Sequence, residues 1–164
     1  MESDRKAFID AMRSVASSVT VVTTNGDAGR YGATVSAFCS VSADPPTILV
    51  CLNAESRIAQ RVSENQKLNI NVLPQNADHI AQRFAGAHDH EVEDRFDNIP
   101  LNISDVPSIS GATILSCEVD QIIPSGSHQI VIGKVISVEK ANKHPLTYYD
   151  GAYHQVTPLT VAAN

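Results

Sequence analysis

Apolar residues recur along the first sixteen residues with the spacing of one helical face. Phe8, Met12 and Val15 stand at positions i, i+4 and i+7, and charged or polar residues occupy much of the rest. A helix has 3.6 residues per turn, so this spacing gathers the apolar side chains on one side. The pattern predicts an amphipathic helix over 2–16, whose apolar face we expect to cover an apolar surface.

The pattern then changes to β-branched residues over 19–24, ending at Asn25-Gly26, a dipeptide typical of tight hairpin turns. A second strand is predicted over 31–42, because apolar or aromatic residues alternate there with small polar ones. Its even positions include four hydroxyl residues, Thr34, Ser36, Ser40 and Ser42. This row of hydroxyls is either the solvated face of an antiparallel strand or, with Phe38 in its midst, a surface for a planar, partly polar ligand.

The remaining elements are short and mostly extended. Asp44-Pro45-Pro46 ends the second strand, and Ser56 and Asn76 are the predicted N-caps of two short helices, the latter running to about Phe84. Further strands are predicted over 47–52, buried on both faces, and over 67–73, 112–123 and 128–140, with a hairpin turn at Asp150-Gly151. At least six strands with few short helices predict a mainly β fold, an antiparallel closed or partly closed barrel.

Residues 85–110 form a long polar connection with Phe96, Ile99 and Leu101 as its apolar anchors. Long connections are usually functional or mobile, so we expect a lid here. The run 88–94 combines imidazoles and carboxylates, but an acidic run in a polar loop is typically solvated, so no metal site is predicted.

Composition narrows the class of protein. A chain of 164 residues with 43% hydrophobic content suffices for one core, so a single domain over 1–164 is expected. The net charge of −6 and the singly scattered basic residues argue against a nucleic-acid partner. No apolar run reaches the roughly 20 residues of a membrane helix, and the start lacks the pattern of a secretion signal, so we expect a cytoplasmic protein without a membrane partner. Cys39, Cys51 and Cys117 are expected to be small buried hydrophobes.

The segment from Gly32 to Ser42, followed by Asp44-Pro45-Pro46, by Val50-Cys51-Leu52-Asn53 and by Ser56, resembles the signature of the short-chain flavin reductase family. The similarity extends from Phe8 to Tyr153. The resemblance implies an FMN-binding split barrel of six to seven antiparallel strands. Members of this family are the reductase components of two-component flavin-dependent monooxygenases.

The resemblance also implies site residues. Thr34, Val35 and Ser36 would border the isoalloxazine, and Phe84 and Ala85 would contact the flavin from the other side. Ser40, Cys51, Asn53 and Ser56 would line the ribityl chain and phosphate, and Val41 is a further expected flavin contact. Taken without the family, Ser56 is an ordinary helix cap and Phe84-Ala85-Gly86 is an ordinary helix end.

Two further residues are expected near the nicotinamide. His128 follows Gly126-Ser127 in a segment similar to the family's Gly-Asp-His, and Tyr153 matches its C-terminal aromatic residue. Ser127 departs from the family, since many relatives carry an acid there. Without the family, His128 would be a surface hydrogen-bonding residue and Tyr153 a core tyrosine.

The implied activity is hydride transfer from NADH or NADPH to FMN or FAD, with the reduced flavin used by a partner monooxygenase and the reductase acting as a homodimer. Because the cofactors carry this chemistry, no side chain is expected to act as acid, base or nucleophile. Two alternatives stay open: a flavin-dependent reductase of a corrin or other metal macrocycle, and a non-catalytic flavin- or haem-binding module. A pyridoxamine-phosphate oxidase shares the fold but needs a cluster of basic residues, which the sequence does not display.

Overall fold

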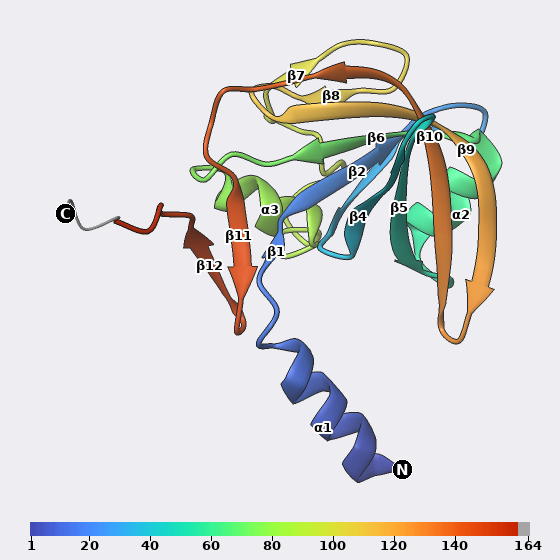
Figure 1. Ribbon diagram of the computed structural model, residues 1–164. Coiled ribbons are helices and arrows are strands. Elements are labelled where there is room, and N and C mark those ends of the chain that lie inside the picture. The colour runs from blue at the N-terminus through green and yellow to red at the C-terminus, as the bar shows by residue number, and fades with distance from the viewer. Residues whose placement is uncertain (161–164) are drawn as a thin grey trace.

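A seven-stranded antiparallel sheet curls around the core of the protein, with its strands in the order β3-β2-β6-β9-β10-β5-β4. The computed structural model describes residues 1–160 (Figure 1). The strands are β2 Thr20–Thr24, β3 Tyr31–Val35, β4 Phe38–Ala43, β5 Pro46–Asn53, β6 Lys67–Val72, β9 Thr113–Ser125 and β10 His128–Glu139. The prediction of a mainly β fold with six to seven strands is confirmed.

Two smaller sheets accompany this barrel. One joins β1 (Ser17–Ser18) to the hairpin of β11 (Leu146–Tyr149) and β12 (Ala152–Gln155), and the other pairs β7 (Leu101–Asn102) with β8 (Ser108–Ile109). The predicted turn at Asp150-Gly151 is confirmed, since both residues have positive φ between β11 and β12.

Two short helices each complete one half of the core. Helix α2 (Arg57–Asn65) buries Ile58, Ala59 and Val62, and α3 (Asp78–Phe84) buries Ile80, Ala81 and Phe84. The predicted cap at Ser56 is confirmed, because its side chain accepts a hydrogen bond from the Ala59 N–H. The predicted cap at Asn76 is wrong: α3 is preceded by Ala77, which has no capping side chain.

The predicted single strand over 31–42 is wrong, because this segment forms two strands, β3 and β4. The chain turns at Ser36-Ala37, where the Phe38 N–H donates to the Ser36 carbonyl at 3.0 Å. The strands on either side, β3 and β4, lie at opposite ends of the sheet. The four hydroxyl residues therefore do not form one row: Thr34 lies on β3, Ser36 lies in the turn, and Ser40 and Ser42 lie on β4 at the other end of the sheet.

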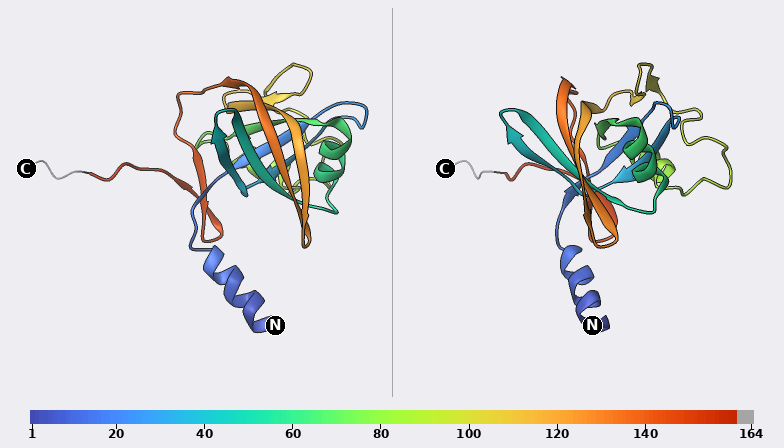
Figure 2. Two further views of the ribbon diagram at one scale, coloured as in Figure 1. Left: turned by 45° about the vertical axis from the view of Figure 1, so that its right-hand side comes forward. Right: turned by 90° about the vertical axis from the view of Figure 1, so that its right-hand side faces the viewer.

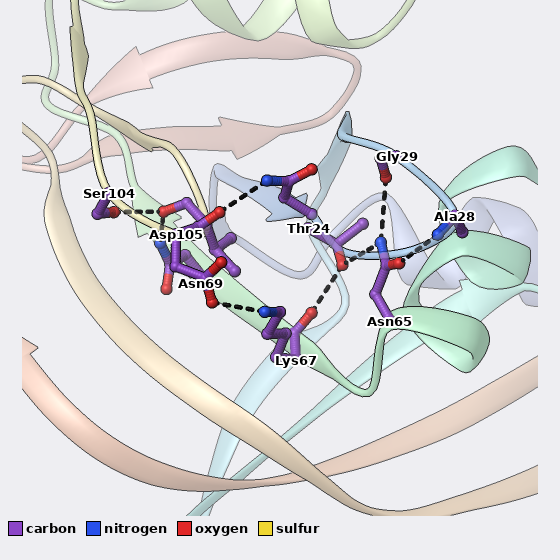
Figure 3. Close-up of polar contacts among 10 residues, drawn as sticks. Thr24, Ala28, Gly29, Asn65, Lys67, Asn69, Ser104 and Asp105 are labelled. Carbon is purple, nitrogen blue, oxygen red and sulfur yellow. Dashed lines mark hydrogen bonds and ion pairs between the residues drawn. The ribbon is translucent and has the colours of Figure 1, made fainter.

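The predicted tight turn at Asn25-Gly26 is also wrong, since β2 and β3 are joined by the six residues 25–30. The side chain of Asn65 orders this loop by accepting from the Ala28 N–H and donating to the Gly29 carbonyl and the Thr24 hydroxyl (Figure 3). A Cβ at Gly26 would come within 2.6 Å of Asn65 Oδ1. Glycine is required there by the close approach of Asn65.

Helix α1 (Glu2–Met12) is shorter than the predicted 2–16 and stands away from the barrel (Figures 1 and 2). None of its residues is buried, and Phe8 is 65% exposed. The expectation that its apolar face covers a surface is therefore not met within one chain.

Two predictions of burial need correction. Strand β5 alternates, with Ile48, Val50 and Leu52 buried and its other residues partly or fully exposed, so it is not buried on both faces. Of the three cysteines predicted to be buried, Cys39 is exposed on the terminal strand β4, Cys51 is partly buried and Cys117 is buried. Burial raises the pKa of the Cys117 thiol to about 12, so this group stays protonated at neutral pH.

The end of the long 85–110 connection is latched to the barrel by buried amides. Asn69 Nδ2 donates to the Val106 carbonyl at 2.8 Å, and Asn71 Oδ1 accepts from the Ile109 N–H at 2.7 Å. Nearby, Lys67 forms an ion pair with Asp105 (Figure 3). Phe96 is buried, and Ile99 and Leu101 pack partly buried against the same cluster, so the predicted anchors are confirmed.

Candidate functional site

A groove of about 300 Å³ lies where the chain crosses from β3 to β4. It is bordered by the open edge of β3, the end of β5, the start of α2 and the start of β10. Seven residues expected at the flavin or the nicotinamide line it together: Thr34, Val35, Ser36, Cys51, Asn53, Ser56 and His128. The family resemblance assigned these seven residues to one site, and the fold brings them together from four different elements.

The wall formed by β3 is rigid and partly unpaired. As the terminal strand, β3 pairs within residues 1–160 with β2 alone, so no strand covers its outer edge there. The Thr34 hydroxyl donates to the Ala81 carbonyl at 2.6 Å, so it fixes β3 against α3. The turn at residues 36–37 is held by a bond from the Cys51 N–H to the Ala37 carbonyl at 2.9 Å.

The opposite wall is set by the cap of α2. The Ser56 hydroxyl donates to the Asn53 carbonyl at 2.6 Å and accepts from the Ala59 N–H at 3.3 Å. Asn53 Oδ1 accepts from the Glu55 N–H at 3.0 Å, which closes a tight turn before the helix. The first N–H groups of a helix lack intrahelical partners and, with the helix dipole, favour an anion.

His128 lies at the rim of the groove, opposite Asn53 in the β5–β10 pairing. The imidazole is exposed, and its Nδ1 lies 2.9 Å from the Ser127 hydroxyl oxygen. Ser127 therefore occupies the hydrogen-bonding position at Nδ1 and orients the ring.

A second compartment of about 210 Å³ adjoins the groove, because Thr34 and Ser36 line both. Ala85 and Tyr153 also line it, which brings two further expected site residues beside the groove. Tyr153 packs edge-on against Tyr148 with ring centroids 5.5 Å apart. Partial burial, with smaller contributions from Tyr148 and Asp78, raises the pKa of Tyr153, so its phenol remains a hydrogen-bond donor at neutral pH.

Three expected flavin contacts lie elsewhere. Ser40 and Val41 are exposed on β4 and line neither compartment. Phe84 is fully buried and packs edge-on against Phe96 at 5.0 Å, so its ring supports the wall from behind. Their roles in binding flavin stay predictions.

The structure reveals a feature that the sequence did not: a cleft of about 660 Å³ lined by four arginines, Arg30, Arg57, Arg61 and Arg95. Along the sequence these residues are isolated, which led to the interpretation that basic residues are scattered. They come from the segment before β3, from α2 and from the 85–110 connection, so only the folded chain brings them together.

Within residues 1–160, no group of three or more His, Cys, Asp or Glu side chains is placed to hold a metal ion. In the same range, no helix is long and apolar enough to span a bilayer.

Comparison with known proteins gives a consistent result. Residues 12–157 match the family model described as flavin reductase like domain. The FMN reductase (NADH) RutF of Yersinia enterocolitica is 35% identical over 153 residues, which cover 92% of this chain and 84% of that protein.

Solved structures agree in fold. The NADH:FAD oxidoreductase SgcE6 of Streptomyces globisporus C-1027, in complex with NAD and FAD fragments, has a TM-score of 0.87 and 26% identity, covering 96% of each chain. Component B of nitrilotriacetate monooxygenase from Mycobacterium thermoresistibile has a TM-score of 0.87 and 26% identity, covering 99% of this chain and 93% of that one. The expected split-barrel fold is confirmed, and this chain belongs to the flavin reductase family.

Proposed function

We propose that this protein is a flavin reductase that transfers a hydride from NADH to FMN or FAD and releases the reduced flavin to a partner monooxygenase. The observation that carries the proposal is the groove itself, in which the edge of β3, the cap of α2 and His128 converge. The activities named for the Yersinia and Streptomyces relatives support NADH and a flavin as the reactants. The mycobacterial relative, a monooxygenase component, supports the oxygenase partner.

The residues of the groove fit a flavin mononucleotide. The open edge of β3 at Thr34–Ser36 offers backbone groups to the polar edge of a ring system. Ser56, at the start of α2, lies where a phosphate is favoured, and Cys51 and Asn53 line the space between the two. When bound, the flavin supplies the hydride-accepting chemistry.

The protein's contribution is to hold two planar reactants together. The bond from Thr34 to Ala81 and the turn at residues 36–37 fix the wall on which the flavin ring would lie. His128, oriented by Ser127, and Tyr153 would orient the nicotinamide. Positioning of this kind lowers the barrier without any acid, base or nucleophile.

Steady-state oxidation of NADH tests the proposal. The protein should oxidise NADH only when FMN or FAD is added, and His128→Ala should raise the KM for NADH about tenfold because a positioning contact is lost. An exposed histidine outside the groove, His144, provides the control, and His144→Ala should behave as wild type. The proposed role of His128 fails if His128→Ala abolishes hydride transfer while leaving the flavin affinity and the KM for NADH unchanged.

We further propose that two copies of this chain associate through α1. Phe8, Ile9 and Met12 are 65%, 43% and 49% exposed, and they line a groove of about 420 Å³ with Ser36 and Tyr148. A contiguous apolar patch of this kind marks an interaction surface. Because Ser36 also lines the flavin groove, a second copy seated there would lie beside the flavin.

Sedimentation velocity tests this association. The wild type should sediment as a dimer at micromolar concentration, and Phe8→Glu combined with Met12→Glu should sediment as a monomer, since two charges would have to be buried. Lys6→Glu, on the same helix but outside this groove, should leave the dimer intact. A monomeric wild type, or a double variant that remains dimeric, would exclude α1 as the interface.

We also propose that residues 1–164 act as one flavin reductase domain in the cytoplasm. The match over 12–157 supports the first statement. The second is supported by three free cysteines, which suit a reducing compartment.

A further inference from the structure

The arginine cleft, lined by Arg30, Arg57, Arg61 and Arg95, continues the flavin groove along the edge of β3. Tyr31 and Gly32 line the cleft, and the next residues of the strand, Ala33 to Val35, line the groove. The same succession occurs on α2, where Ser56 lines the groove and Arg57 lines the cleft. From Ser36 to Tyr31 the edge of the strand extends about 17 Å, at roughly 3.3 Å per residue. A ligand longer than one nucleotide, lying along this edge, would pass from the groove into the cleft.

The charges of the cleft leave a cationic excess. Its lining includes three carboxylates, of which Asp94 pairs with Arg30 at 2.6 Å and Asp89 pairs with Arg95 at 2.7 Å. The pKa of Asp89 is lowered by its hydrogen bonds from Arg95, and Arg57 contributes a smaller lowering, so Asp89 is ionised at neutral pH. Two guanidinium groups, those of Arg57 and Arg61, then remain with one carboxylate, that of Glu93, so the cleft has a net positive charge.

Contacts within the protein hold two of the four arginines of the cleft in place. Arg95 donates to the carbonyls of Gly32 and Phe84 at 3.1 and 2.9 Å and lies over the ring of Tyr31. Arg61 donates to the Ala28 carbonyl, which ties α2 to the loop before β3. Arg57, in contrast, is exposed and makes no hydrogen bond or ion pair within residues 1–160. Its guanidinium is free to engage a ligand.

We propose that the arginine cleft binds the phosphate-bearing second nucleotide of a dinucleotide, and that the adenylate of FAD is the occupant. This inference rests on the proposed function, since it takes the flavin ring to lie on β3. Guanidinium groups bind phosphate through paired, charge-assisted hydrogen bonds, which an ammonium or an amide does not reproduce. FAD is favoured because the cleft begins beside Ser56, where the flavin phosphate is expected. The second nucleotide of NADPH carries the same chemistry, and the experiment separates the two.

Isothermal titration calorimetry of the full chain with riboflavin, FMN, FAD, NADH and NADPH tests the inference without relying on turnover. Arg57→Glu reverses the free charge, and Lys140→Glu makes the same change of net charge at an exposed site outside the cleft. We expect Arg57→Glu to weaken FAD about tenfold relative to FMN, a typical loss for one charge-assisted contact. Riboflavin affinity should be unchanged in both variants, and Lys140→Glu should bind all five ligands as wild type does.

The affinity ratios of the Arg57→Glu variant decide which ligand occupies the cleft. A selective loss for FAD relative to FMN supports the proposal. A selective loss for NADPH relative to NADH, with the FAD to FMN ratio unchanged, would overturn FAD as the occupant and assign the cleft to a nicotinamide dinucleotide. Unchanged ratios for both pairs would overturn the inference, and so would an equal loss for riboflavin, because the effect would then arise in the groove. Binding of flavins without NADH oxidation would contradict the proposed function alone.

Discussion

Replacing Asn71 by alanine should destabilise the protein by about 3 kcal/mol, since three hydrogen bonds of a buried amide are lost and their partners stay behind. Asn71 is fully buried and donates to the Val21 carbonyl at 2.8 Å and to the Thr23 hydroxyl at 3.1 Å. Its Oδ1 accepts from the Ile109 N–H at 2.7 Å. The Thr23 hydroxyl in turn donates to the Pro107 carbonyl, so the loss extends to the whole latch between the barrel and β8.

Thermal and urea unfolding measure this loss. For a chain of this size about 3 kcal/mol corresponds to a melting temperature lower by roughly 6–12 °C. Asn142→Ala is the matched control, because Asn142 is exposed after β10 and should change stability by less than about 0.5 kcal/mol. A loss below about 1 kcal/mol at Asn71 would mean that water replaces the amide, and the latch would then not depend on this side chain.

The second large effect is expected at Gly32. A Cβ there would lie 2.6 Å from Cε1 and 2.8 Å from Cδ1 of Phe84, and 3.2 Å from Phe96. Both rings are buried and packed edge-on, so neither can move freely. Gly32→Ala should therefore cost about 2 kcal/mol and push β3 away from α3. Because Thr34 lies on β3 and Ala85 directly follows α3, the KM for flavin should rise more than the KM for NADH.

A second substitution separates steric strain from other causes. Phe84→Leu removes the ring atoms that meet the new methyl group, so Gly32→Ala and Phe84→Leu together should cost less than the sum of the two single changes. Urea unfolding of the four proteins gives the coupling energy, and flavin titration gives the affinity. Strict additivity would show that the methyl group is accommodated elsewhere.

Local patterns predicted most of the elements but not their order in the sheet. The Ser56 cap and the Asp150-Gly151 turn depend on neighbouring residues only, so the sequence displayed them. The break at Ser36-Ala37 has no glycine or proline to announce it, and alternation continues through it. The turn there is imposed by the bond between Ala37 and Cys51, a contact with another strand.

The sequence also predicted part of the site, namely the residues of the flavin groove but not those of the arginine cleft. The family signature named seven residues that the fold brings to one groove, because that signature spans the elements that build it. The arginine cleft was invisible along the chain, since its members are separated by up to 65 residues, from Arg30 to Arg95. The exposure of α1 was equally hidden, because an amphipathic pattern does not say whether its apolar face meets the same chain or another.

The placement of β3 and β4 at opposite ends of the sheet also bears on how the protein folds. The groove requires β3 to lie beside the end of β5, and in the sheet these two strands are separated by β2, β6, β9 and β10. Several of these pairings join distant parts of the chain, which slows folding. An intermediate holding only the central strands would lack the groove and would not bind flavin. Flavin bound in the proposed groove would therefore stabilise only the completed barrel, and it would favour the native state over partly assembled ones.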